Sequence, residues 1–156
     1  MEKEKVLALI KKAENLIPLK MEKDLKPLNG IPNIPDWHNY ETNIWRIGEE
    51  IRQIIAANKV LRKDAEINNL ILNICLNKNS KRGRQSFILL LGYKHLSEHS
   101  RELIKMINDN SVDGHIIDTI YKMQSAEFVK EIRPFKTNQQ AWIRKIASKY
   151  LEKYAT

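Results

Sequence analysis

Two histidines in the chain have the spacing of a metal-binding pair. His95 and His99 are four residues apart, and this spacing can place two imidazoles on one face of a helix for a metal ion. However, the surrounding segment YKHLSEHSREL has the composition of a turn between two helices, where that geometry fails, and no third ligand is evident nearby. We interpret both histidines as partly exposed residues of a turn.

Three aspartates offer a second kind of chemistry. Asp109, Asp113 and Asp118 could form an acidic cluster for proton transfer or cation binding. Their spacing fits the start of a helix better, because aspartate there accepts hydrogen bonds from free amides and complements the helix dipole. We therefore predict a capping role for this group.

The signature motifs of the common enzyme classes are absent from the sequence. The five glycines are isolated from one another, so no phosphate-binding loop is present, and there is no HExxH, nucleophile elbow or CxxC. The single cysteine, Cys75, excludes an intrachain disulfide and a cysteine-cluster zinc site, and we predict that it is a small core residue. We expect no catalytic residue, no cofactor and no metal.

The positive charge of the chain is concentrated in two blocks. The whole chain has a formal charge of +8, from 27 basic and 19 acidic residues. Residues 78–101 hold six basic residues against one acidic, and residues 126–156 hold seven against three. The segment between them, 102–125, holds two basic residues against four acidic ones. The two blocks are therefore the places to look for a binding surface.

The sharpest part of the first block is NKNSKRGR, residues 77–84, a predicted loop that leads into a helix. Basic side chains and helix-start amides together can hold a phosphate or an acidic side chain. Since Arg144 and Lys145 begin a later helix in an equivalent way, the two blocks can form one surface. We predict that this partner-binding patch consists of Lys78, Lys81, Arg82, Arg84, Arg144, Lys145 and Lys149.

Three interpretations of this patch stay open. It can bind an acidic protein partner, it can bind a nucleic-acid backbone with salt-sensitive affinity, or its lysines can be a solvated face that only aids solubility. The mixed charges elsewhere and the lack of an RNA-binding aromatic motif favour the first and third interpretations over nucleic acid.

The elements that must position these residues are helices. Four of the five prolines lie between residues 18 and 35, and the long remainder is poor in both proline and glycine, which is typical of an all-α protein. We predict a single all-helical domain, 1–156, with an N-terminal helix at 1–17, a proline-rich segment at 18–42 and a helical body at 43–156. The apolar side chains of the proline-rich segment are predicted to pack against the body: Leu25, Leu28, Ile31, Ile34, Trp37 and Tyr40.

The body shows apolar residues at helical spacing and a repeat in its second half. Helices are predicted at 42–58 and at 65–77, the latter capped by Asp64. Further helices start at 83, 112 and 143, which are 29 and 31 residues apart, with second helices at 96–109 and 126–135 between them. Superposing the three starts aligns three sets of residues: Phe87, Ile116 and Ala147; Leu90, Thr119 and Tyr150; Leu91, Ile120 and Leu151.

Residues 83–154 resemble the HEAT-like repeat family of α-solenoids. The resemblance rests on the turn LIKMINDNSVDG and on the helix starts GRQSFILLLGY and AWIRKIASKYL. It implies a right-handed α-solenoid of stacked antiparallel helix pairs, whose concave face usually binds a protein and less often nucleic acid.

These observations lead to a ranked set of functions. The first is a non-enzymatic interaction module that binds a protein or peptide, with an acidic partner suggested by the basic blocks. The second is a nucleic-acid backbone binder. The third is an enzyme similar to the DNA alkylation-repair glycosylases of HEAT-like fold, for which no catalytic aspartate and aromatic pair can be assigned.

The lack of an apolar run of about 20 residues and of a signal peptide predicts a cytoplasmic protein without a membrane span. The oligomeric state stays open.

Overall fold

A computed structural model describes residues 1–27 and 34–156 of the chain. Helix accounts for 74% of these residues and none of them lies in a strand, so the predicted all-α class is confirmed. The chain divides into two compact units, Met1–Ser86 and Phe87–Thr156. No described helix combines the length and the apolar character that a membrane span requires.

The first unit is built around three helices. They are α1 (Glu2–Leu16), α2 (Asn39–Ala56) and α4 (Ala65–Leu76), and α1 packs against both of the others. The inner stripe of α1 is fully buried, and so are the facing stripes of α2 and α4. Each fully buried isoleucine contributes about 2 kcal/mol through the hydrophobic effect, so this apolar contact holds α1 in place. The buried side chains include Val6, Ile10, Ala13, Ile44, Ile51, Ile67 and Ile71.

Short elements connect and cap these helices. Asp64 accepts a hydrogen bond of 3.0 Å from the Ile67 amide, as predicted for the cap of α4, and this bond followed by Lys3 lowers the pKa of its carboxyl. Cys75 near the end of α4 is fully buried, and this burial raises the pKa of its thiol, which fits the predicted core role. The single-turn helix α3 (Lys59–Arg62) was not predicted; the Asn58 side chain caps it by accepting from two amides.

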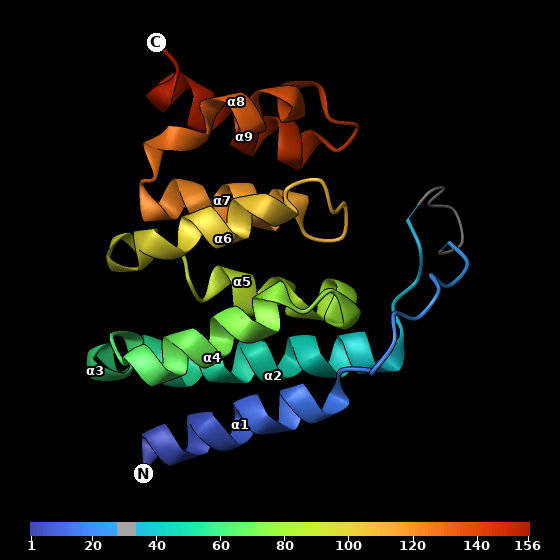
Figure 1. The fold of residues 1–156 in the computed structure, drawn as a ribbon, viewed down its shortest axis with the longest axis vertical. Helices are drawn as coiled ribbons and strands as arrows, with labels where there is room; N and C mark the ends of the chain where they lie inside the picture. The colour runs from blue at the N-terminus through green and yellow to red at the C-terminus, as the bar shows by residue number, and fades with distance from the viewer. Residues whose placement is uncertain (28–33) are drawn as a thin grey trace. The chain divides into compact units, whose positions relative to one another are not determined.

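An arm connects α1 to α2. We use this name for residues 17–27 and 34–37, which Figure 1 shows as part of a loop projecting from the ends of the two helices. The predicted packing of the proline-rich segment is wrong for Leu25 and Ile34, which are 40% and 38% exposed. Most contacts that hold the arm go to its carbonyls and to one carboxylate, which leaves Leu25 and Ile34 outside. Trp37 is half-buried, and its ring lies against the Arg82 guanidinium. The predictions for Leu28 and Ile31 lie outside the described residues.

The second unit contains α7 (Asp113–Met123) and α9 (Ala141–Tyr154), which pack against each other. Shorter helical elements precede each of them: η2 (Lys94–His99), α6 (Ser100–Leu103) and η3 (Ile104–Met106) before α7, and η4 (Ala126–Phe128), α8 (Val129–Ile132) and η5 (Arg133–Thr137) before α9. A buried tyrosine joins α9 to the turn after α7. The Tyr150 hydroxyl donates to the Ser125 carbonyl at 2.5 Å and accepts from the Phe128 amide at 3.1 Å.

All nine residues that the predicted repeat register aligns are buried, none being more than 7% exposed. The register therefore picks the inward positions of three helix starts correctly. The first of these helices is shorter than predicted, whereas α7 and α9 begin within two residues of their predicted starts. The helix expected from residue 83 consists of the 3-10 helix η1 (Lys78–Arg84) followed by α5 (Gln85–Leu89). After Leu89 the amides of residues 90–92 bond to the residue three positions earlier, which tightens the chain into a 3-10 turn and ends the helix.

Candidate functional site

The first basic block forms a closed loop rather than an open site. We call residues 77–84 the basic loop. Its first turn is held by the Asn77 carbonyl, which accepts from the amide and the hydroxyl of Ser80. Lys81 then adopts φ 49° and ψ −130°, a conformation that costs a residue with a side chain about 1–3 kcal/mol. The contacts of the residues on either side of this turn offset that cost.

Arg84 is fully buried, so the structure removes it from the predicted patch. Its Nε donates to the Lys81 carbonyl at 3.0 Å and its Nη1 to the Cys75 carbonyl at 3.2 Å. Cys75 lies in the last turn of α4, where carbonyls lack a partner within the helix and favour a positive charge. Arg84 therefore caps the carboxyl end of α4 and has a structural role.

Arg82 is also bound by groups of its own chain. Its amide donates to the Glu41 carboxylate at 3.0 Å, its Nε lies 3.6 Å from the same carboxylate, and its Nη2 donates to the Asp36 carbonyl at 2.6 Å. The guanidinium also lies 5.0 Å from the centre of the Trp37 ring, a cation–π contact. Glu41 is 1% exposed and accepts a further bond of 2.7 Å from the His38 amide at the start of α2. The buried carboxylate is thus fully compensated.

The remaining residues of the basic loop bind the arm. The Lys81 ammonium pairs with Asp24 at 2.5 Å, and the Asn79 side chain donates to the Pro18 carbonyl at 3.0 Å. Only 11% of the Lys81 side chain is exposed. Of the four predicted residues in this block, Lys78 alone is exposed. The ligands of the basic loop are therefore the chain's own carboxylates and carbonyls.

Gly83 allows this loop to approach α2 closely. A Cβ atom at this position would lie 2.7 Å from the Glu41 carbonyl oxygen and 3.0 Å from the Ile44 Cβ, closer than side-chain atoms pack. The glycine between two arginines is thus required by the contact that also brings Arg82 to Glu41.

The second basic block lies on α9. Arg144 occupies the position equivalent to Arg84 and makes the equivalent contact: its Nη1 donates to the Asn138 and Gln139 carbonyls at 2.7 and 3.0 Å. Each arginine thus ties the start of its helix to the carbonyls of the preceding segment. Arg144 nevertheless remains exposed, whereas Arg84 is buried.

Three lysines of α9 stand in a row on the surface. Lys145, Lys149 and Lys153 follow one another at four-residue intervals, which places them on one side of the helix, and all three are exposed. We call them the lysine face. No salt bridge engages any of them within the described part of the chain. Lys149 and Lys153 lie 5.5 and 5.4 Å from the centre of the Tyr121 ring, which orients both ammonium groups.

Trp142 stands at the amino-terminal end of the same helix and is 45% exposed. The indole packs so closely on Gly114 that a Cβ there would lie 2.2 Å from its nearest atom. The ring also meets His115 edge-on at 5.2 Å, and its Nε1 donates to the Gln140 side chain at 3.0 Å. Trp142 therefore offers a fixed, half-exposed aromatic surface next to the lysine face.

The other residues that could bind a metal or transfer protons do not form a common site. Asp109 accepts from both the amide and the hydroxyl of Ser111, Asp113 accepts from the Gly114 amide, and Asp118 pairs with Lys122 at 3.0 Å. Asp109 and Asp113 thus make local contacts in the turn and the first turn of α7, but the N-cap of this helix is Val112, without a side-chain bond. The predicted capping role is wrong for Asp118, which lies inside α7. His95 and His99 lie at the two ends of η2, and no group of three metal-ligating side chains exists among the described residues.

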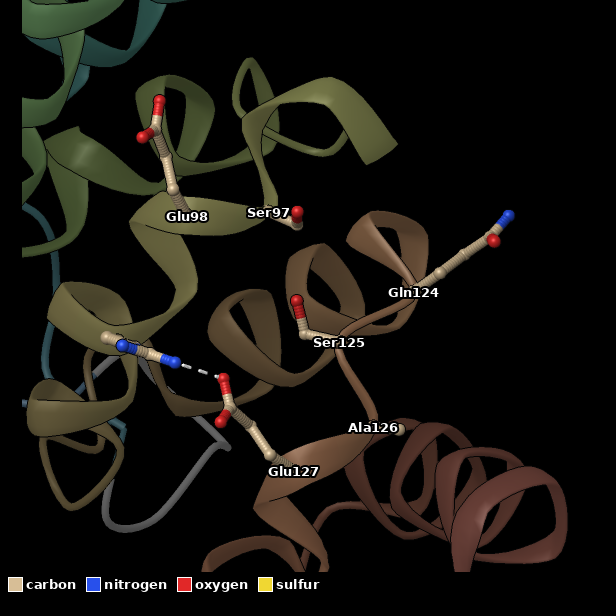
Figure 2. A pocket seen from close by; sticks show the side chains of 7 residues that line it. Ser97, Glu98, Gln124, Ser125, Ala126 and Glu127 are labelled. Atoms are coloured by element: carbon tan, nitrogen blue, oxygen red, sulfur yellow. Dashed lines mark hydrogen bonds and ion pairs between the residues drawn. The ribbon is translucent and has the colours of Figure 1, made fainter.

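A pocket opens in the second unit between η2 and the turn that follows α7. Figure 2 shows Ser97 and Glu98 on one side and Gln124, Ser125 and Glu127 on the other. Its volume is about 510 Å³, and the only bond drawn across it joins Arg101 to Glu127 at 3.5 Å. Both of these charges are exposed, so the pair is weak. The described residues include no histidine or carboxylate bonded to either serine hydroxyl, so neither is activated as a nucleophile.

No family model matches this sequence, and no curated protein or solved structure matches it either. The function therefore has to be argued from the two basic blocks. Of the seven predicted patch residues, four are exposed and form no ion pair among the described residues: Lys78, Arg144, Lys145 and Lys149. Lys78 lies in the other unit and Arg144 is bound to two carbonyls, which leaves Lys145 and Lys149. Lys153 and Trp142 complete the surface on α9. The four-residue spacing of 145, 149 and 153 was the signal that could have identified Lys153.

Proposed function

We propose that the chain is a non-enzymatic, cytoplasmic interaction module that binds an acidic protein or peptide through the lysine face. The observation that carries the proposal is the row of Lys145, Lys149 and Lys153 beside the half-exposed Trp142. The three lysines are exposed, and none has a carboxylate partner in the part of the chain that the structure describes. Aromatic anchors next to a charged rim are the usual composition of a protein-binding surface.

We further propose that the helices of the two units belong to one right-handed HEAT-like α-solenoid. Two findings support it. All nine residues aligned by the 29- and 31-residue repeat are buried. Arg84 and Arg144, at equivalent positions, both bind carbonyls of the segment before their helix.

A nucleic-acid backbone is the second candidate, because a row of lysines also neutralises phosphates. The aromatic residues favour the protein partner. Single-stranded nucleic acid is held by bases stacked on open aromatic rings, whereas two lysine side chains already lie over the Tyr121 ring.

The test is a binding measurement with defined polyanions. A labelled polyglutamate peptide of about 20 residues is titrated with the native protein and with the variant Lys145→Gln/Lys149→Gln/Lys153→Gln at two salt concentrations. We expect the variant to bind about tenfold more weakly, since three charge contacts are lost. The control is Lys11→Gln/Lys12→Gln/Lys78→Gln, which removes the same charge from exposed positions elsewhere and should change affinity by less than about threefold.

Two results would contradict the proposal. Equal losses in both variants would show that only net charge matters. Tighter binding of single-stranded RNA than of polyglutamate, lost in the lysine-face variant alone, would favour the nucleic-acid candidate.

A further inference from the structure

Two ammonium groups of the lysine face converge on one aromatic ring. The ammonium of Lys149 lies 5.5 Å from the centre of the Tyr121 ring, and that of Lys153 lies 5.4 Å from the same centre. The Lys153 ammonium also lies 5.3 Å from the centre of the Tyr154 ring. Contacts of this kind restrict where a lysine head group can go. Lys149 and Lys153, which we call the lysine pair, therefore present two positive charges at one place.

The lysine pair is uncompensated in the part of the chain that the structure describes. Neither ammonium forms an ion pair there, and Asp118 on the adjacent helix α7 is paired with Lys122 at 3.0 Å. In the basic loop, by contrast, the Lys81 ammonium pairs with Asp24 of the same chain. Two positive charges that converge on one point are best neutralised by a single ligand group with two negative charges, because that group need not be assembled from two side chains.

A phosphate monoester is the group on proteins that carries such a charge. Phosphoserine and phosphothreonine have a charge of about −1.5 to −2 at pH 7 and three strong acceptor oxygens. A carboxylate and a nucleic-acid phosphodiester each carry about one negative charge, which leaves one ammonium of the pair uncompensated. The lysine pair thus favours a phosphorylated side chain over glutamate and over the backbone of nucleic acid.

The exposed indole of Trp142 favours a peptide over a small phosphate compound. Trp142 lies on the same side of α9, seven residues before Lys149 and eleven before Lys153. At 1.5 Å per residue, these separations are about 10 and 17 Å along the helix. About four residues of extended peptide cover the distance from the indole to the middle of the pair. A peptide can therefore contact both, with Lys145 between them.

We propose that the acidic partner is phosphorylated on serine or threonine and that its phosphate binds between Lys149 and Lys153. The inference rests on the proposed function, since it assigns the chemistry of the group that the lysine face binds. Tyr121 is a positioning residue: its ring holds both ammonium groups in place before the ligand arrives, which reduces the entropy cost of binding.

The first experiment compares peptides of about 12 residues that differ at one central position. They carry leucine four positions to either side of that position, and the position itself is phosphoserine, glutamate or serine. A fourth peptide has two adjacent glutamates and matches the charge of the phosphopeptide. We expect the phosphopeptide to bind about fivefold more tightly than the glutamate peptide and about threefold more tightly than the charge-matched one, measured by fluorescence anisotropy.

The outcomes separate this inference from the proposed function. Equal affinities for the phosphopeptide and the charge-matched peptide overturn the inference and leave an acidic partner in place. No binding of any acidic peptide overturns both.

The second experiment locates the phosphate. Lys149→Gln/Lys153→Gln should remove the preference for phosphoserine over two glutamates. Lys11→Gln/Lys12→Gln removes the same charge from exposed positions of α1 and should keep the preference within about twofold. Equal effects of the two double variants overturn the proposal. All four lysines are exposed, so neither variant is expected to disturb the fold.

The positioning role of Tyr121 has its own test. Tyr121→Leu removes the ring and should lower the preference for phosphoserine about twofold to threefold, while Tyr121→Phe keeps the ring and should retain it. Circular dichroism checks that both variants are folded. A preference that is unchanged in folded Tyr121→Leu, or lost equally in Tyr121→Phe, would contradict the role of the ring.

Discussion

The two basic blocks have similar compositions, but the fold covers most charges of one and leaves those of the other exposed. In the basic loop, Arg84 is buried and Arg82 and Lys81 are almost covered, because each finds a carbonyl or carboxylate of its own chain. On α9, the lysine face is exposed and meets no carboxylate among residues 1–27 and 34–156. The number of positive charges therefore does not identify a binding surface. What identifies it is how many of those charges the fold leaves without a partner.

The difference arises from what lies before each block. The basic loop follows directly on α4, whose last carbonyls need donors, and the arm brings a carboxylate and two carbonyls into reach. The segment before α9 supplies only the carbonyls of Asn138 and Gln139, and Arg144 satisfies both. The lysines farther along α9 are left for an external partner.

The largest expected effect is the difference in unfolding free energy between variants of the two equivalent arginines, Arg84 and Arg144. Arg84→Met should lower the free energy of unfolding by about 3 kcal/mol, because it leaves the Lys81 and Cys75 carbonyls buried without donors. Arg144→Met should cost less than about 1 kcal/mol, since water can replace the guanidinium at an exposed site. Urea unfolding of both variants measures the contrast. Equal costs would show that the two positions are structurally alike.

The next effect is a pH dependence that arises from His115 in the second unit. Burial lowers the pKa of His115 from 6.5 to about 4, so the unfolded chain binds the proton more readily. Stability is therefore complete above about pH 6.5 and falls as the pH drops towards 4, by about 2 kcal/mol at pH 5. Asp113 has the opposite effect on stability. Burial raises the pKa of its carboxyl, so the folded chain binds this proton more readily than the unfolded chain and gains stability as the pH falls.

The variant His115→Gln isolates the contribution of the imidazole to the pH dependence of stability. It should reduce the loss of stability between pH 7 and pH 5, measured by urea unfolding, while Asp113→Asn should make that loss steeper. A native protein with equal stability at the two pH values would contradict the burial of the imidazole.

Much of the fold could be predicted, because helix starts and inward positions depend on local patterns. The apolar spacing gave the nine buried register positions, and Asp64 was recognisable as a cap from its own neighbours. The fate of Arg84 was not predictable, because it depends on the carboxyl end of α4 arriving beside it. The exposure of Leu25 and Ile34 was missed for a similar reason: their hydrophobicity suggested packing, but polar contacts with the basic loop hold the arm.

The smallest expected effect lies where the basic loop meets the arm. Asp24→Asn removes the ion pair with Lys81 and should cost about 0.5–1 kcal/mol, because Lys81 is nearly covered although 69% of Asp24 is exposed. Glu102→Gln breaks a pair with Lys105 whose partners are both exposed, and should cost less than about 0.5 kcal/mol. A sharper measurement is the rate of trypsin cleavage after Lys20 and Lys23. It should rise severalfold in Asp24→Asn and stay unchanged in Glu102→Gln, since only the first frees the arm. Unchanged cleavage in both variants would show that the contacts of Asn79 and Arg82 with arm carbonyls hold the arm by themselves. The ion pair of Lys81 would then contribute nothing to its position.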